Sequence, residues 1–108
     1  MSIKSQLLTG KYLRELKTEI LFFVAAAKAS GDELIILDVK SVFGDERDLK
    51  RVDSAARVLK ELKRQGRIQL FVCSSDFDSS FTELEYLKNK YPSIIDIKSD
   101  EIFFVIKM

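Results

Sequence analysis

The clearest pattern along the chain is an uninterrupted apolar run at residues 34–37, followed by the charged residues Asp38 and Lys40. Apolar side chains at every position predict a strand that is covered on both faces, as the central strands of α/β sheets are. We place this strand at Glu33–Lys40. Polar residues at the carboxyl end of such a strand mark the first place to look for a functional site.

A helical pattern precedes this strand, with Thr9 as its expected N-cap and Gly31 as the residue that ends it. The positions expected to be buried recur every three or four residues: they are Leu13, Leu16, Ile20, Phe23 and Ala27. The second half of this helix is apolar on all sides, and a sheet covers only one side of a helix. Either the segment with Leu7 and Leu8 or a second copy of the protein must cover the rest, and we favour the second copy.

A second helix is predicted from Asp45, its N-cap, to Gly66. Glu46 and Asp48 lie in its first turn, where the helix dipole favours acidic side chains. Its expected buried positions are Leu49, Val52, Ala56, Leu59 and Leu62. The opposite side of this helix is basic: it carries Lys50, Arg57, Lys60, Lys63, Arg64 and Arg67.

Three strands and one more helix complete the prediction. A second apolar strand is expected at Arg67–Ser74, and strand, helix and strand in this succession indicate a right-handed parallel crossover. A third helix follows and ends before Pro92. The strands Ser93–Lys98 and Glu101–Lys107 then form a C-terminal hairpin.

The predicted fold is a single α/β domain, residues 1–108, with the element order α-β-α-β-α-β-β. Its sheet has four strands and is mixed: the first two strands are parallel, and the last is antiparallel. The last strand is apolar throughout residues 102–106 and so needs cover on both faces. We therefore expect the strand order 2-1-4-3, with the last strand inside the sheet. Alternatively, its free edge pairs with another chain.

Composition narrows the class of protein. The chain has 108 residues, 46% of them hydrophobic and 32% charged, which is typical of one globular domain. The formal net charge is +1, so no global field attracts nucleic acid or an anionic membrane, although a local basic patch remains. The single Cys73 suits a reducing compartment. With no visible signal peptide and no apolar run near the roughly 20 residues that span a bilayer, we expect a soluble cytoplasmic protein with no membrane partner.

The chain contains no histidine. Ser-His-Asp and Cys-His arrangements are therefore excluded, and a single cysteine without histidine argues against a zinc site. We expect no cofactor. Any catalytic group must come from Asp, Glu, Lys, Ser, Tyr or Cys side chains.

Asp38, Lys40 and Asp76 are the candidate catalytic residues, because the carboxyl ends of parallel strands meet at one sheet edge. Together with Asp78, such carboxylates would suit Mg²⁺ and phosphoester chemistry. Solvated strand ends and helix capping explain most of these acids more simply, and so we favour the absence of a catalytic centre.

The triplet Asp38-Val-Lys40 resembles half of the PD-(D/E)xK nuclease motif. That motif needs an earlier acidic residue on the preceding strand of a hairpin. Here the only earlier acids close by are Asp32 and Glu33, which belong to the same predicted strand. The resemblance implies a metal-dependent nuclease, and this departure counts against it.

The stretch Ile35–Ser75 resembles the middle of a STAS domain. It has Leu-Asp-Val at a strand end, a long helix that ends in Lys-Arg-Gln-Gly, and then Gln-Leu-Phe-Val-Cys. The resemblance covers about a third of the chain and implies a small protein-interaction module, such as an anti-sigma factor antagonist. A STAS domain opens with strands, whereas this chain is predicted to open with a helix.

The basic helix face supplies the candidate nucleic-acid-binding residues, which are Lys50, Arg57, Lys60 and Arg64. Such a face can follow phosphates. However, Asp53 and Glu61 interrupt it, and no aromatic residues are interleaved for base stacking, so a solvated face is the simpler interpretation. Cys73 lies within an apolar strand and is expected to be a buried, inert thiol.

We therefore favour a non-catalytic protein-interaction or regulatory module that acts as a homodimer. The alternatives are a metal-dependent nuclease-like enzyme and a nucleic-acid-binding module.

Overall fold

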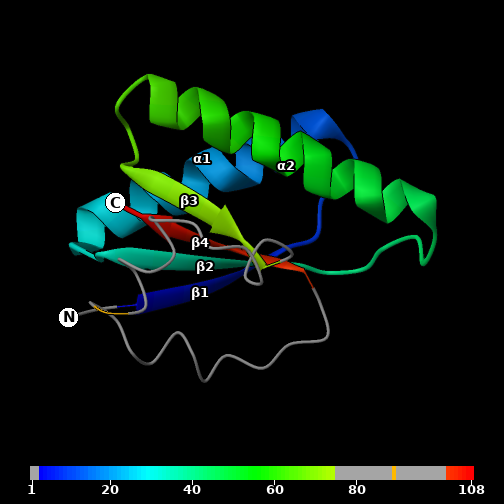
Figure 1. Cartoon of the computed structure of the whole chain (residues 1–108), viewed down its shortest axis with the longest axis horizontal. Coiled ribbons are helices and arrows are strands. Elements are labelled where there is room, and N and C mark those ends of the chain that lie inside the picture. Colours follow the sequence, from blue (N-terminus) through cyan, green and yellow to red (C-terminus); the bar gives the residue numbers. More distant parts are fainter. Residues whose placement is uncertain (1–2, 75–88, 90–101) are drawn as a thin grey trace.

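The computed structural model describes residues 3–74, 89 and 102–108 of the chain. In chain order its elements are β1 (Ile3–Leu8), α1 (Leu13–Ser30), β2 (Leu34–Val39), α2 (Glu46–Arg64), β3 (Leu70–Cys73) and β4 (Phe103–Lys107) (Figure 1). The strands form one mixed four-stranded sheet, so the predicted α/β class is confirmed. The predicted third helix and the predicted strand Ser93–Lys98 lie outside the described residues.

The sheet order is β1-β2-β4-β3. β1 runs parallel to β2, with Ile3 opposite Leu34 and Leu8 opposite Val39, whereas β4 is antiparallel to both β2 and β3. The predicted antiparallel pairing of the last strand with the strand at Glu33–Lys40 is therefore confirmed.

The predicted order 2-1-4-3 is wrong in one respect, because it places Arg67–Ser74 beside Glu33–Lys40. The corresponding strands β2 and β3 do run in the same direction, but β4 lies between them. All five residues of β4 are buried. Its interior position gives its backbone hydrogen-bond partners on both edges and its apolar side chains cover on both faces.

β1 is a strand that the sequence pattern did not predict. Only Leu8 within it is buried, and Leu7 is 43% exposed, as suits a strand at the edge of a sheet. The chain thus opens with a strand, and this strand takes the place beside β2 that the prediction gave to Arg67–Ser74.

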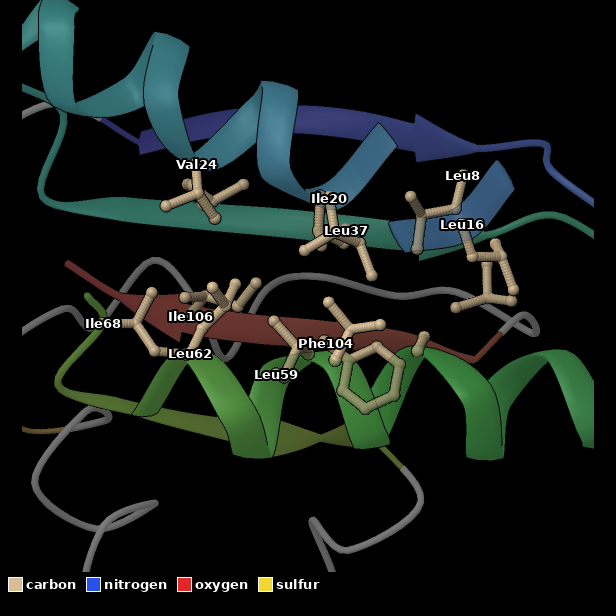
Figure 2. Packing of buried hydrophobic residues seen from close by; sticks show 14 of the residues in the cluster. Leu8, Leu16, Ile20, Val24, Leu37, Leu59, Leu62, Ile68, Phe104 and Ile106 are labelled. Carbon is tan, nitrogen blue, oxygen red and sulfur yellow. The ribbon is translucent and has the colours of Figure 1, made fainter. Parts of the chain in front are cut away.

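The helices α1 and α2 lie on the same face of the sheet (Figure 1). From β1 to β2 and from β2 to β3 the chain moves across the sheet in one direction, and right-handed crossovers in one direction place their helices on one face. Side chains from α1, α2 and the sheet meet in the core between the layers (Figure 2). This core includes Leu8, Leu16, Ile20, Val24, Leu37, Leu59, Leu62, Ile68, Phe104 and Ile106.

The opposite face of the sheet carries a second buried cluster. Its members are Leu34, Ile36, Val72, Phe103 and Val105. Along β2, Ile35 and Leu37 belong to the core under the helices, and their neighbours Leu34 and Ile36 belong to this second cluster. The apolar run at residues 34–37 is at most 5% exposed, which confirms the prediction of a strand covered on both faces.

The predicted buried stripes of the helices are partly wrong. In α1 the buried residues are Leu16, Ile20, Val24 and Ala27, and in α2 they are Arg51, Ala55, Val58, Leu59 and Leu62. Leu13 and Leu49, both predicted to be buried, are 46% and 59% exposed. In α2 the buried stripe begins with Arg51, so Leu49 is turned away from the sheet.

The predicted helix caps are confirmed at two positions and wrong at one. Gly31 ends α1 in the left-handed conformation, and the Asp45 carboxylate accepts a hydrogen bond from the Arg47 N–H at the start of α2. The N-cap of α1 is Tyr12, which makes no side-chain capping bond. Thr9 instead donates its N–H and its hydroxyl to the carboxylate of Glu19.

Neither α1 nor α2, the helices within the described residues, combines the length and the apolar character needed to cross a lipid bilayer.

Candidate functional site

The buried side chain of Arg51 connects three parts of the backbone. Arg51 is only 2% exposed. Its Nε donates to the carbonyl of Gly10 (2.7 Å), its Nη2 to the carbonyl of Leu8 (2.9 Å), and its Nη1 to the carbonyl of Lys40. One guanidinium thereby joins α2 to the end of β1, to the turn before α1 and to the end of β2.

Asp48 organises the loop that precedes α2. Its carboxylate accepts hydrogen bonds from the Ser41 hydroxyl (2.8 Å) and from the backbone N–H groups of Val42 (2.9 Å), Phe43 (3.1 Å) and Gly44 (2.6 Å). It also pairs with Nη1 of Arg51 at 3.4 Å. The loop hydrogen bonds, above all that from the Val42 N–H, hold the pKa of Asp48 well below its ordinary value of 3.8, because they favour the ionised form.

Gly10 lets the turn after β1 pack closely against α1. A Cβ atom on Gly10 would lie 3.0 Å from Cβ of Glu15 and 3.1 Å from the backbone nitrogen of Leu16. The close approach places the Gly10 carbonyl within reach of Arg51. Gly10 therefore has a packing role in addition to marking a turn.

A groove runs between the exposed sides of the two helices and consists of two hollows. The first, of about 270 Å³, is lined by Lys11, Tyr12, Leu13, Phe43, Arg47, Lys50, Arg51 and Ser54. The second, of about 470 Å³, is lined by Leu13, Lys17, Leu21, Arg57, Val58, Glu61, Leu62, Gln65 and Arg67. Leu13 lines both, so the hollows adjoin. We call the first the aromatic hollow, the second the wide hollow, and both together the interhelical groove.

The interhelical groove combines an apolar base with a basic rim. Val58 and Leu62 are buried in the core, and Leu21 packs against that core. The exposed cationic side chains are Lys17, Arg57 and Arg67 around this base in the wide hollow, and Lys11, Arg47 and Lys50 in the aromatic hollow. The acidic lining residue is Glu61, which pairs with the Arg64 guanidinium (Nε–Oε2 3.0 Å). This pairing holds the pKa of Glu61 below its ordinary value, and it offsets the negative charge of Glu61 locally.

Two aromatic rings stand at the end of the groove where both helices begin. Tyr12 is 66% exposed, and its ring centroid lies 6.4 Å from that of Phe43. The guanidinium carbon of Arg47 lies 4.1 Å from the centre of the Phe43 ring, a cation–π contact. Arg47 also pairs with Asp45, with 3.0 Å between Nη2 and Oδ2. Aromatic and cationic groups therefore share one small hollow.

The candidate nucleic-acid-binding residues Lys50, Arg57, Lys60 and Arg64 all lie on the exposed side of α2. Lys50 lines the aromatic hollow and Arg57 the wide hollow. Arg64 is paired with Glu61, and Lys60 is exposed without lining either hollow.

Arg67 was expected on this basic face, but Lys11 and Lys17 were missed as its partners. Lys11 and Lys17 lie before and within α1 and meet α2 only in the folded chain. The same holds for the aromatic Tyr12, which comes beside Lys50 although the basic stretch of the sequence contains no aromatic residue. No local sequence signal brings these residues together.

The candidate catalytic residues are placed differently. Asp38 lies in β2 opposite Phe103 of β4, and by strand alternation it shares the face of Leu34 and Ile36, away from the helices. Lys40 is exposed just beyond the end of β2. Asp76 and Asp78 lie outside the described residues.

The carboxyl ends of β2 and β3 lie at the same edge of the sheet, as predicted, but they are not neighbours because β4 lies between the two strands. The hydroxyl oxygen of Ser74, just after β3, accepts a hydrogen bond from the N–H of Phe103 (3.0 Å). Since each strand step is about 4.8 Å, the neighbourhoods of Asp38 and Ser74 lie about 10 Å apart. Within residues 3–74, 89 and 102–108, no group of three or more Asp, Glu and Cys residues is placed to hold a metal ion.

The nuclease resemblance gains no support from the strand next to Asp38. β1 has the sequence Ile-Lys-Ser-Gln-Leu-Leu, which contains no acidic residue, and it runs parallel to β2 instead of forming a hairpin with it. Cys73 is buried, at 8% exposure, as predicted.

Comparisons of this chain with protein-family models, with curated proteins and with solved structures find no match. The resemblance of Ile35–Ser75 to a STAS domain thus stays an analogy. A function has to be inferred from the chemistry of the site itself.

Replacing Arg51 by Lys is expected to destabilise the fold strongly. Lysine keeps the charge but lacks the planar fork of donors that reaches three carbonyls. Because the buried charge would then lack part of its hydrogen-bond partners, we expect the free energy of unfolding to fall by about 3–5 kcal/mol in urea denaturation. Arg47→Lys, at a side chain 60% exposed on the same helix, should cost less than about 1 kcal/mol. Equal losses in the two variants would contradict the structural role of Arg51.

Asp48 should make stability depend on pH in the acid range. Its pKa in the folded protein lies below the ordinary 3.8, so its ionised form stabilises the native state above that value. This stabilisation is lost as the pH falls toward the folded-state pKa. Asp48→Asn is therefore expected to be less stable than the wild type at neutral pH, with a difference that shrinks between about pH 5 and pH 2 in thermal unfolding.

The matched control for Asp48→Asn is Asp53→Asn, which removes one negative charge from an exposed position of the same helix. A stability difference for Asp48→Asn that stays constant down to about pH 2 would show that its carboxylate does not carry the effect.

Proposed function

We propose that the protein is a non-catalytic binding module and that its interhelical groove binds nucleic acid through the phosphate backbone. The observation that carries this proposal is the gathering of cations from separate segments around one groove. Lys11, Lys17 and Arg67 join Lys50 and Arg57 of α2 there. Among the described residues that line the groove, the one acidic side chain, Glu61, is already paired with Arg64.

The spacing of the cations suits a linear polyanion. Lys50 and Arg57 are seven residues apart on α2, which corresponds to about 10 Å along the helix axis. They therefore point to the same side of the helix at successive places along the groove. Lysine and arginine contacts to phosphates release condensed counterions, and this release drives such binding. The protein's low net charge of +1 does not oppose such binding, because the ligand responds to the local electric field of the cations around the groove.

The same groove would also suit an acidic protein segment, which would keep the protein-interaction function expected from the sequence. An acidic amphipathic segment would use the cations and the apolar base together. We favour nucleic acid because aromatic rings accompany the cations at one end, as in surfaces that bind single strands. The metal-dependent nuclease stays a prediction that rests on Asp38, Lys40 and Asp76.

Fluorescence anisotropy with a labelled oligothymidine tests the proposal. The strand should exceed the roughly 4–16 nucleotides that one small domain covers. Affinity should fall linearly with salt on a double-logarithmic plot. The double variant Lys50→Gln/Arg57→Gln should bind more weakly, and its slope should be lower by about 1.4, since each single-strand phosphate contact contributes roughly 0.7.

Lys4→Gln/Lys28→Gln is the matched control, because it removes two cations from outside the groove. Its affinity and salt slope should equal those of the wild type. The absence of oligonucleotide binding at low salt contradicts the proposed function. If polyglutamate binds to the groove instead, the partner is an acidic protein segment.

We further propose the homodimer expected from the sequence, with a surface on α1. Phe22 is 67% exposed, and Ala25 and Ala29, three and seven residues further on, are exposed on the same side of the helix. Static light scattering at micromolar concentration should give twice the mass of the chain, and Phe22→Ser should lower it. A wild-type mass equal to one chain would rule out this dimer.

A further inference from the structure

We propose that the aromatic hollow holds one unpaired nucleobase against Tyr12, so that the interhelical groove prefers single-stranded to double-stranded nucleic acid. This inference rests on the proposed function. The carrying observation is the placement of an exposed aromatic ring inside a basic hollow: Tyr12 is 66% exposed and lines the same 270 Å³ as Lys11, Lys50 and Arg47.

The size of the hollow favours a single ring system. Pockets for drug-sized ligands have volumes of roughly 300–1,000 Å³. The aromatic hollow, at about 270 Å³, lies just below that range. It has room for a base, but not for the stacked pairs of a duplex. In a duplex, moreover, the faces of the bases are already stacked on one another, so Tyr12 has a free base to stack on only in a single strand.

The two rings of the hollow differ in what they offer a ligand. One face of Phe43 is occupied by the Arg47 guanidinium at 4.1 Å, and Phe43 is only half-buried beneath it. Tyr12 is the ring that stays open to solvent. The base is therefore assigned to Tyr12, with Arg47 and Phe43 forming the adjacent wall.

Hydrogen bonds to the backbone on either side hold the walls of the aromatic hollow in place. The N–H of Phe43 is bonded to the Asp48 carboxylate at 3.1 Å, and the Tyr12 carbonyl accepts the N–H of Leu16 at 3.0 Å in the first turn of α1. Beneath them, Arg51 binds the Gly10 and Lys40 carbonyls on either side. A binding surface that is ordered before the ligand arrives loses less entropy on binding.

Charged groups flank the hollow where the phosphates of the stacked nucleotide would lie. Lys11 precedes Tyr12 in the chain, and Lys50 reaches the hollow from α2. From Lys50 the line of cations continues to Arg57 in the wide hollow. A strand with one base on Tyr12 thus meets a further cation, Arg57, for a later phosphate, with the exposed Asp53 between Lys50 and Arg57 on α2.

Stacking and phosphate contacts respond differently to salt, and this difference separates the inference from the proposed function. Phosphate contacts set the slope of affinity against salt, whereas stacking on a ring involves no counterion release. Loss of the Tyr12 ring should therefore weaken single-strand binding about equally at every salt concentration. Loss of Lys50 and Arg57 should lower the slope.

The test compares wild type, Tyr12→Ala and Tyr12→Phe in anisotropy titrations with labelled oligothymidine and with a blunt duplex of the same length. We expect Tyr12→Ala to weaken oligothymidine binding about tenfold with an unchanged salt slope, and to leave duplex binding within about twofold. Tyr12→Phe keeps a ring and should bind like the wild type. Leu49→Ala, which truncates an exposed apolar side chain of α2 outside the groove, is the control and should also bind like the wild type.

Other outcomes would contradict either this inference alone or the proposed function as well. If the wild type binds oligothymidine and Tyr12→Ala binds it equally well, the base is not on Tyr12 and the inference fails alone. A parallel loss on single strand and duplex also overturns it, because the ring then acts on the groove as a whole. If the wild type binds no oligonucleotide, the inference falls together with the proposed function. Because Tyr12 is exposed, its variants are expected to fold, and their thermal midpoints verify this.

Discussion

The charge of Arg51 is enclosed by carbonyl groups from parts of the chain that are far apart in sequence. A buried guanidinium without these partners would carry a large desolvation penalty, and without the guanidinium the three carbonyls would lose the group that links them. Each side therefore requires the other. The Arg51 side chain thereby fixes three features relative to one another: the position of α2 over the sheet, the turn through Gly10 and the exit of the chain from β2. Asp48 extends this constraint to the loop that carries Phe43.

The groove depends on the same constraint. Its aromatic end is formed by residues on either side of the Arg51 side chain: Tyr12 follows the turn at Gly10, and Phe43 lies in the loop after Lys40. The groove is thus assembled from two loops and two helix starts, and the hydrogen bonds of Arg51 and Asp48 connect these parts. The hydrogen bonds of Arg51 and Asp48 below the surface therefore position the segments that carry Tyr12 and Phe43.

Local patterns predicted those features that local chemistry decides. The burial of residues 34–37 follows from their apolar side chains. Gly31 can end a helix because glycine readily adopts the left-handed conformation, and Asp45 can begin one because its short side chain accepts a backbone N–H. β1 escaped prediction because an edge strand buries only Leu8 and shows no strong alternation. The insertion of β4 between β2 and β3 escaped because strand order depends on pairings between distant residues, which adjacent residues do not encode.

The candidate site shows the same division. The exposed basic side of α2 could be predicted, because helical spacing alone places Lys50 and Arg57 together. Arg51 could have been noticed, since it shares the helical phase of Ala55, Val58 and Leu62, but an arginine among lysines and arginines suggests a solvated position. The arrival of Tyr12, Lys11 and Lys17 opposite α2 is a property of the folded chain and has no local signal.

The position of β4 has a consequence for the order in which the sheet is completed during synthesis. β4 is the last of the described strands to leave the ribosome, yet it occupies the space between β2 and β3. Before it arrives, β1, α1 and β2 can already pair and pack as a parallel unit, whereas β3 has no neighbour in the described sheet. Until residues 103–107 are synthesised, the edges of β2 and β3 that pair with β4 have no hydrogen-bond partner in the described sheet. Completion of the fold is therefore a late, long-range event.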